Sequence, residues 1–299
     1  MALTADRRRP SEAPTLPIVA AVGAMLVLTA SLIASKYLLD VVLDFRWPIA
    51  VYVALLAVVG YAPSVWWCRY ASRRWGTGRL GDDIGLRARW SDLGWGPVVW
   101  LGALGTQVVA VAVVVAFAVP ISTNTEALNE ASIDRTYAIS LVIAAVIAAP
   151  IVEEMVFRGI VLRGLRSRLP VVAAVVAQGL LFGVAHVDPV RGSGNVGLVI
   201  VLSGVGIAFG VASQLLRRIG PSIVAHALFN GAVLLVVLTG VADRLQDVGS
   251  AREEVGVVDQ PHVAEARSDG DSVPIAGAVR VDDPYDFERV GVEDTHVVE

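Results

Sequence analysis

The feature that most constrains this chain is a set of seven long runs without Asp, Glu, Lys or Arg. A helix needs roughly 17 to 25 mostly apolar residues to cross the hydrocarbon of a bilayer, and each run is near or above that length. The runs cover residues 16–35, 47–68, 93–125, 136–152, 169–185, 192–216 and 219–242. We therefore predict an all-α, polytopic membrane helix bundle with about seven transmembrane helices.

Composition supports this class and argues against a soluble domain. Of the 299 residues, 55% are hydrophobic and 17% are charged, whereas about 25% are charged in a typical soluble domain. The single cysteine, Cys68, excludes an intrachain disulfide. We expect the lipid bilayer to surround the helices, and we expect no nucleic-acid partner.

Arginine placement predicts the orientation of the bundle. Arginines gather in the N-terminal segment and in alternate connections between the runs, whereas the other connections are poorer in arginine and richer in acid. We therefore expect a multi-pass protein of the cell membrane, and the positive-inside rule places its N-terminus on the cytoplasmic side. After seven spans the C-terminal tail would lie outside. The arginines are Arg7, Arg8, Arg9, Arg69, Arg73, Arg74, Arg79, Arg87, Arg89, Arg163, Arg166, Arg168, Arg217 and Arg218.

Three segments follow from this organisation. Residues 1–15 form a cytoplasmic N-terminal segment, and residues 16–242 form the transmembrane domain, with the motifs described below in 136–242. Residues 243–299 form an acidic tail with 15 acidic and 5 basic residues. The tail has no long apolar run with which to offset the entropy of ordering, so we predict that it is disordered.

Two adjacent carboxylates, Glu153 and Glu154, arrive at the end of the fourth uncharged run. A charged side chain at bilayer depth costs about 2.5 to 3.5 kcal/mol on insertion scales, so such residues usually serve a function. In a helix, Arg158 lies on the face of Glu154 four residues later, which favours an ion pair. Glu153 points about 100° away and lacks that local partner. One acid is thus neutralised while the other stays available.

Two histidines lie in or at the ends of the apolar runs. His186 shares a helical face with Phe182, and His226 shares one with Asn230, because each pair is four residues apart. Residues 153 and 186 are equidistant from the Leu169–Pro170 turn, so a helical hairpin would place them at the same depth.

Each of these residues has a structural interpretation when taken alone. A lone histidine or Phe182 is more often a packing residue, Asn230 could make an interhelical hydrogen bond, and the Glu154–Arg158 pair could be purely structural. A transporter or channel could use the same acids and histidines to relay protons or bind a cation. A non-catalytic immunity or scaffold protein is a third alternative. Convergence of all these polar groups at one place favours a catalytic site.

The motifs resemble those of a known family. E-E-M-V-F-R at 153–158, F-G-V-A-H at 182–186 and H-A-L-F-N at 226–230 are similar to the EExxxR, FxxxH and HxxxN motifs of the CAAX protease and bacteriocin-processing family of intramembrane proteases. This family includes CAAX prenyl endopeptidases and bacterial Abi-type proteins. The resemblance covers about residues 136–242 and implies an endopeptidase that acts on a membrane-associated or lipidated peptide or protein.

The resemblance also implies roles for the matching residues. Glu153 would be the general base that activates water with the help of His186, while His226 and Asn230 would stabilise the oxyanion of the tetrahedral intermediate. Glu154 and Arg158 would form a supporting ion pair.

The cofactor stays open at the level of sequence. Glu153, His186 and His226 form a His₂Glu set that could bind zinc and leave a fourth position for water. The family is usually described as metalloproteases, but the same residues also support a metal-free glutamate mechanism. No HExxH sequence occurs. We favour the metal-free version, because Asn230 beside His226 suits a pair of hydrogen-bond donors better than a ligand shell.

Overall fold

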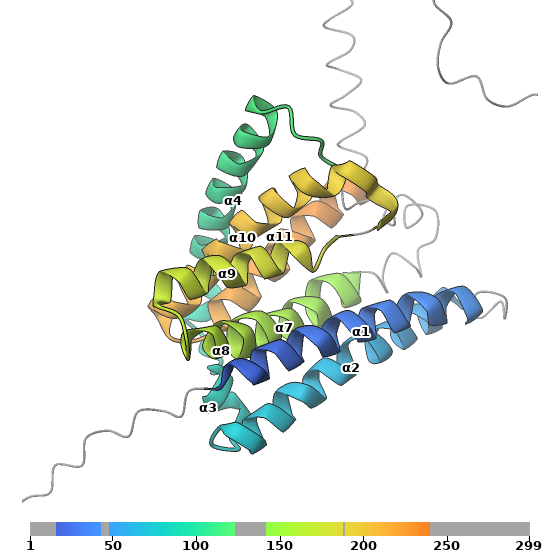
Figure 1. Ribbon diagram of the computed structural model, residues 1–299. Coiled ribbons are helices and arrows are strands. Elements are labelled where there is room, and N and C mark those ends of the chain that lie inside the picture. Colours follow the sequence, from blue (N-terminus) through green and yellow to red (C-terminus); the bar gives the residue numbers. More distant parts are fainter. Residues whose placement is uncertain (1–15, 43–47, 123–141, 188, 240–299) are drawn as a thin grey trace, which may run out of the picture. The chain divides into compact units, whose positions relative to one another are not determined.

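The computed structural model describes residues 16–42, 48–122, 142–187 and 189–239. The chain divides into two units, 1–249 and 250–299, and all described residues belong to the first. Every regular element among them is a helix (Figure 1). The all-α fold class is confirmed for this part of the chain. The acidic tail from residue 243 lies outside the described residues, so its disorder stays a prediction.

The first two uncharged runs form neighbouring helices, α1 (Ile18–Val42) and α2 (Ile49–Trp75). The Trp67 indole donates a hydrogen bond to the Ala20 carbonyl at 3.0 Å. Gly23 makes room for this ring, because a Cβ atom at that position would clash with it. A second hydrogen bond, from the Ser31 hydroxyl of α1 to the Gly60 carbonyl of α2 at 2.8 Å, also joins the two helices.

The third run forms a long helix, α4 (Asp92–Ala116), that packs against the two last helices of the bundle, α10 (Asn195–Leu216) and α11 (Gly220–Leu238). A short helix that the uncharged runs do not predict, α3 (Leu80–Ile84), lies between α2 and α4 in the chain. Its Ile84 is fully buried and contacts the position of Gly159, where a Cβ would lie 2.8 Å from Ile84 Cβ.

The segment that carries both glutamates is one continuous helix whose winding changes along its length. It consists of η2 (Ile143–Ala148), α7 (Ala149–Glu154), η3 (Met155–Val161) and α8 (Leu162–Arg166), and the residues at the junctions keep right-handed helical dihedrals. The two η segments are π-helical, a rare winding found frequently at functional sites. Pro150 contributes to this change of winding, because it has no N–H to donate to the preceding turn.

Helices α9 (Val171–Val184) and α10 approach closely through small residues. Gly179 and Gly183 on α9 face Gly206 and Ser203 on α10, and a Cβ at Gly183 would lie 2.5 Å from the Val199 carbonyl oxygen. This spacing is the small-xxx-small pattern of helix packing in membranes. Between α9 and α10 the chain forms a short turn of 3₁₀-helix, η4 (Pro189–Gly194).

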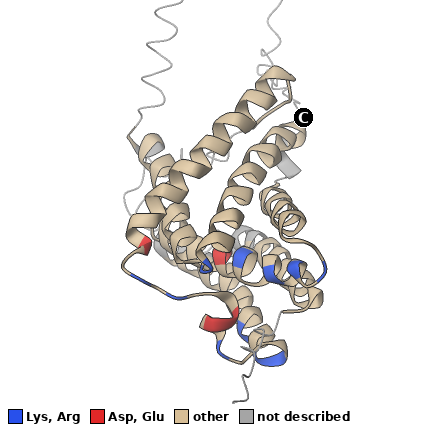
Figure 2. Ribbon diagram, turned by 90° about the vertical axis from the view of Figure 1, so that its left-hand side faces the viewer, with Lys and Arg blue, Asp and Glu red and all other residues tan. Residues whose placement is uncertain are grey.

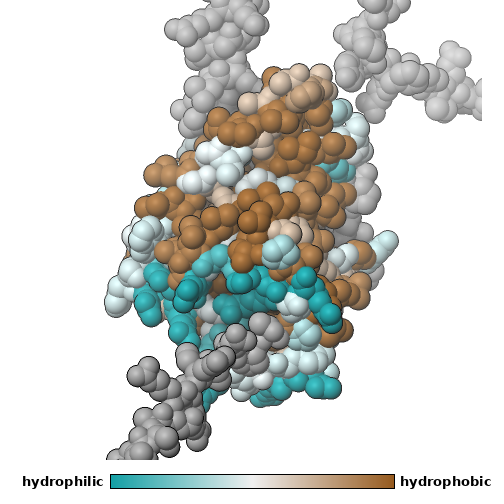
Figure 3. Space-filling model, turned by 60° about the vertical axis from the view of Figure 1, so that its left-hand side comes forward, coloured by the Kyte–Doolittle hydropathy of each residue, from teal (hydrophilic) through white to brown (hydrophobic). Residues whose placement is uncertain are grey.

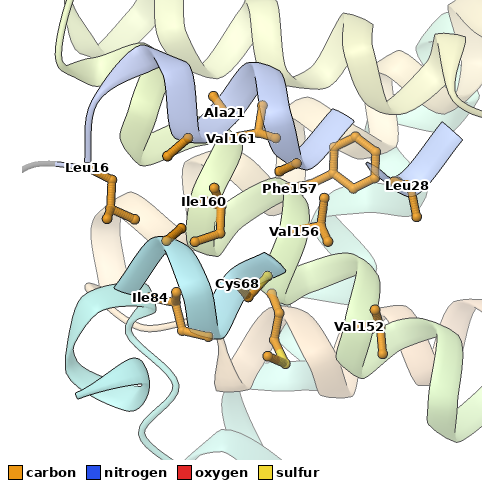
Figure 4. Packing of buried hydrophobic residues seen from close by; sticks show 14 of the residues in the cluster. Leu16, Ala21, Leu28, Cys68, Ile84, Val152, Val156, Phe157, Ile160 and Val161 are labelled. Carbon is orange, nitrogen blue, oxygen red and sulfur yellow. The ribbon is translucent and has the colours of Figure 1, made fainter. Parts of the chain in front are cut away.

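The largest hydrophobic cluster of the described residues surrounds the helix built from η2, α7, η3 and α8, which we call the motif helix (Figure 4). Val156, Phe157 and Ile160 are at most 1% exposed and pack against Leu28 of α1 and Cys68 of α2. Burial of such side chains contributes about 1.5 to 3 kcal/mol each when the alternative is water. The glutamates therefore directly precede a helical segment, η3, whose residues are all buried.

Three described helical stretches are long and apolar enough to cross a membrane: Ile18–Ser35, Asp92–Ala116 and Gly192–Leu216. Val171–Val184 and Gly220–Val236 are apolar but shorter. The face in Figure 3 is covered mostly by apolar side chains, with a hydrophilic band near one end. The count of seven spans stays a prediction, because part of the fourth run lies outside the described residues.

Candidate active site

Three stretches of the bundle bring the motif residues together. Glu153 and Glu154 end α7 and Arg158 lies in η3, while His186 follows α9 and His226 lies in α11. The predicted hairpin is observed: α8 ends at Arg166, α9 begins at Val171, and the Glu153 Oε2 to His186 Nε2 distance is 4.0 Å.

The Glu154–Arg158 ion pair lies in the interior. Arg158 Nη1 donates to Glu154 Oε1 at 2.7 Å, and both side chains are 0% exposed. Arg158 Nη2 also donates to the Gly206 carbonyl at 3.1 Å, which ties η3 to α10. The guanidinium lies 4.6 Å from the Phe182 ring centroid and 5.1 Å from that of Phe209. Aromatic faces attract cations, so the buried charge is compensated on several sides.

Glu154 also fixes the tautomer of His226. His226 Nδ1 lies 3.1 Å from Glu154 Oε1, the oxygen that accepts from Arg158. An ionised carboxylate only accepts hydrogen bonds, so Nδ1 must carry the proton. Nε2 is the other ring nitrogen, and it lies 3.8 Å from Glu153 Oε2.

His186 is held in the same tautomer by the backbone. Its Nδ1 lies 2.8 Å from the Phe182 carbonyl oxygen, which can only accept, so Nδ1 is again the donor. Its Nε2 also lies near Glu153 Oε2, at 4.0 Å. Glu153 Oε2 has no hydrogen-bond partner among the described residues. Three polar atoms from three stretches of the chain thus meet, and each of them is able to bind a water molecule.

The two sides of the site differ in accessibility. The side chains of Glu153 and His186 are 15% and 22% exposed, whereas Glu154 and Arg158 are 0% exposed. His226 joins the two sides, because one of its nitrogens faces each glutamate. Glu153 and His186 are therefore partly accessible from outside the bundle, whereas the ion pair is not.

Phenylalanine rings form the walls of the site. The Phe182 centroid lies 4.8 Å from the His186 ring and 5.8 Å from the His226 ring. Phe209 lies 5.5 Å from His226. Phe182 is 2% exposed, so its packing role agrees with the sequence interpretation, and its contacts with both imidazoles restrict their orientation.

Asn230 has a contact that the motif does not reveal. Its Nδ2 donates to the Ala145 carbonyl at 2.7 Å, which joins α11 to the π-helical segment η2. This bond uses one of the two N–H groups of the amide. Participation of Asn230 in an oxyanion hole stays a prediction.

Sequence reasoning missed two groups beside the site. Tyr61 of α2 packs against the hydrophobic cluster around the helix that carries Glu153, and the Gly206 carbonyl accepts from Arg158. Neither lies in a recognisable motif, and a backbone carbonyl leaves no trace in a residue pattern. The only signal for Tyr61 is that it is a polar aromatic residue within an uncharged run.

The described side chains do not form a metal centre as they are arranged. No group of three or more His, Cys, Asp or Glu side chains in this part of the chain has the arrangement to hold an ion. Glu153 Oε2 lies 3.8 and 4.0 Å from the two imidazole nitrogens, compared with about 3.4 Å between ligands of tetrahedral zinc at bonds near 2.1 Å. Both the metal-dependent and the metal-free mechanism stay predictions.

An all-helical bundle with span-capable apolar helices and a carboxylate–imidazole cluster indicates a membrane protein with a hydrolytic or ion-handling site. Residues 135–232 match the model of the Rce1-like family, described as type II CAAX prenyl endopeptidase Rce1-like. This match confirms the resemblance that the motifs indicate, and the matched segment includes all six candidate residues. No curated protein and no solved structure matches the chain. The family points to a CAAX-type intramembrane protease.

Proposed function

We propose that this protein is an intramembrane endopeptidase in which Glu153 activates water to hydrolyse a peptide bond of a membrane-associated or lipidated substrate. The observation that carries the proposal is the meeting of Glu153 Oε2 with the Nε2 atoms of His186 and His226, at 4.0 and 3.8 Å. A transport pathway does not require two imidazoles to converge on one carboxylate oxygen.

The geometry suits general-base catalysis. A water molecule between Glu153 and His186 would give one proton to the carboxylate while its oxygen attacks the carbonyl carbon of the scissile bond. The electrons of the carbonyl double bond move to its oxygen, forming the oxyanion. When the intermediate collapses, the C–N bond breaks and the leaving amine takes the proton from Glu153.

His226 and Asn230 are the proposed donors to the oxyanion. Donation through His226 Nε2 requires the doubly protonated ring, and Glu154 at 3.1 Å from Nδ1 would stabilise that charge. Asn230 follows one turn later on α11 and retains a second N–H beside the one bound to Ala145. Fixed donors of this kind are typically worth about 2.7 to 4 kcal/mol each. No step in this scheme passes through a metal ion.

We propose that the protein is a multi-pass cell-membrane protein with its arginine-rich end in the cytoplasm. Basic residues lie mostly toward one end of the bundle in Figure 2. Arg163 and Arg166 at the end of α8 lie near Arg217 and Arg218 at the end of α10, since Arg166 Nη1 donates to Gln214 Oε1 at 2.7 Å. This clustering supports the positive-inside orientation.

A reconstituted system would test the function. Full-length protein in liposomes is offered quenched fluorescent peptides with and without a lipid group, and proton or cation flux is measured in the same vesicles. We expect cleavage by the wild type and none by Glu153→Gln, while Asp82→Asn, an exposed acid at the cytoplasmic end, cleaves normally. Ion flux without cleavage would favour the transporter. The absence of both cleavage and ion flux would favour a non-catalytic relative.

A further inference from the structure

Arginine side chains from two helices converge at the end of the bundle where the motif helix stops. Arg163 and Arg166 lie in α8, and Arg217 is the C-cap of α10. We propose that these three arginines, which we call the basic cluster, bind the phosphate group of an anionic phospholipid. The inference goes beyond the proposed function, because none of the three residues belongs to the candidate active site.

The turn at Gly85 holds Arg163 next to the end of α10. Gly85 has a left-handed backbone with φ 73°, and a Cβ atom there would clash with the Arg163 guanidinium and lie 3.5 Å from the Arg218 Cα. The Gly85 carbonyl also accepts a hydrogen bond from the Ile219 amide at 3.0 Å. Glycine at this position thus leaves open the space that the Arg163 guanidinium occupies.

A second contact joins Arg166 to the same end of α10. Arg166 Nη1 donates to Gln214 Oε1 at 2.7 Å. Arg217 follows Gln214 by about one helical turn and directly precedes Arg218. Because Gln214 contacts α8 and Arg218 contacts the Gly85 turn, Arg217 between them belongs to the same surface as Arg163 and Arg166.

The nearby acids are bonded to groups outside the basic cluster. Their partners, at 2.6 to 2.9 Å, are Arg87 for Asp82, Arg218 for Asp92 and Thr77 for Asp83. Asp83 attracts Arg163 only through space, since its oxygens also accept from the hydroxyls of Ser72 and Thr77. Within the described part of the chain, no arginine of the basic cluster forms an ion pair. A phosphate group has several oxygens and can accept from more than one of these guanidinium groups.

Exposed apolar side chains border the basic cluster, which favours a lipid over a soluble phosphate. Leu169 and Val172, just after α8, are 38% and 75% exposed, and Leu215 beside Gln214 is 76% exposed. Figure 3 shows such a boundary, where a hydrophilic band meets the apolar face. A phospholipid places its phosphate at this level while its acyl chains cover the apolar side chains. Basic pockets at the cytoplasmic ends of membrane helices bind anionic headgroups in this way.

Native mass spectrometry of the full-length protein in a neutral detergent tests the site. The protein is titrated with phosphatidylglycerol and, separately, with phosphatidylcholine that carries the same acyl chains. We expect phosphatidylglycerol to bind at least about tenfold more tightly, because only its headgroup has a net negative charge. Inorganic phosphate alone should bind at least about tenfold more weakly than phosphatidylglycerol, since it lacks acyl chains. Equal affinity for the two lipids, or inorganic phosphate as tight as phosphatidylglycerol, would overturn the proposal.

Substitutions distinguish this site from a general attraction to a basic surface. Arg163→Gln and Arg166→Gln should each weaken phosphatidylglycerol binding about fivefold, the typical effect of one arginine near an anionic membrane surface. Arg73→Gln is the matched control, because it removes the same charge from the last turn of α2, and Arg73 forms no bond with the described residues of α8 or α10. It should bind as the wild type does. Equal weakening by Arg73→Gln would overturn the site, since only net charge would then matter.

The variant Arg217→Gly distinguishes a loss of binding from a loss of folding. The Arg217 backbone is left-handed, with φ 54° and ψ 27°, a conformation that glycine adopts at helix ends without strain. Arg217→Gly should therefore unfold no earlier than the wild type, while its affinity for phosphatidylglycerol falls about fivefold. Unfolding in detergent and native mass spectrometry measure the two effects. Unchanged affinity in a variant that stays folded would remove Arg217 from the site and contradict the proposed cluster.

Discussion

Glu153 and Glu154 are neighbours in the chain, yet they lie in opposite surroundings. Glu154 is fully buried, and one of its oxygens meets Arg158 at 2.7 Å and His226 at 3.1 Å. Glu153 is 15% exposed, and its Oε2 lies 3.8 and 4.0 Å from the Nε2 atoms of His226 and His186. A rotation of about 100° along one helix therefore produces an ion-paired acid and an available base from the same residue type.

The difference between the glutamates predicts opposite effects of the same substitution. Glu153→Gln should lower cleavage by about a thousandfold or more, because the base is removed, and should leave stability nearly unchanged. Glu154→Gln should lower stability by roughly 3 to 5 kcal/mol, because Arg158 keeps a buried charge without its partner. Cleavage rates and unfolding in detergent measure the two effects. Equal losses of stability in both variants would contradict the different roles assigned to Glu153 and Glu154.

A substitution of Arg158 tests the same buried ion pair from its basic partner. Arg158→Met leaves Glu154 charged and buried, so we expect destabilisation of similar size, roughly 3 to 5 kcal/mol. The double variant with Glu154→Gln should recover much of that loss, since no charge then remains unpaired. A denaturation series on the single and double variants gives the coupling. Additive losses would contradict the ion pair as the stabilising unit.

The variant Asn230→Ala distinguishes a structural role of Asn230 from a catalytic one. Asn230→Ala removes the bond to the Ala145 carbonyl, and interhelical hydrogen bonds in membranes average about 0.6 kcal/mol. If the amide also stabilises the oxyanion, kcat should fall by about a hundredfold, far more than this stability change explains. The measurement is kcat beside the unfolding midpoint. A small loss in both would leave Asn230 as a helix contact only.

Metal removal should have the smallest effect. Because the site performs each proposed step with its own side chains, incubation of active protein with a strong chelator should leave the cleavage rate unchanged. The rate is measured before and after dialysis against the chelator, with a known zinc protease as the positive control. Loss of activity that returns on addition of zinc would contradict the metal-free scheme.

Local spacing predicted the parts of the site that lie within one helix or one hairpin. Glu154 and Arg158 are four residues apart, so helical geometry alone places them together, and the shared turn brings Glu153 level with His186. The fold class also followed from the uncharged runs, because only helices with internal backbone bonding suit such segments in lipid.

Contacts between distant helices could not be predicted in the same way. The bond from His226 to Glu154 depends on how α11 rotates against α7, and a residue pattern on either helix does not state that angle. The π-helical winding of η2 and η3 breaks the regular 3.6-residue period on which face assignments depend. Tyr61 packs against the cluster around the glutamate-bearing helix from α2, whose sequence carries no motif.

The proposed hydrolytic site requires that His186 and His226 both direct Nε2 at Glu153. Full-length protein with ¹⁵N-labelled histidine in detergent tests this arrangement, with signals assigned by His186→Asn and His226→Asn. Glu153→Gln should shift the Nε2 signals of both rings, whereas Asp82→Asn should shift neither. If Glu153→Gln leaves either ring unaffected, the three helices do not converge on one carboxylate, and the proposed hydrolytic site is contradicted.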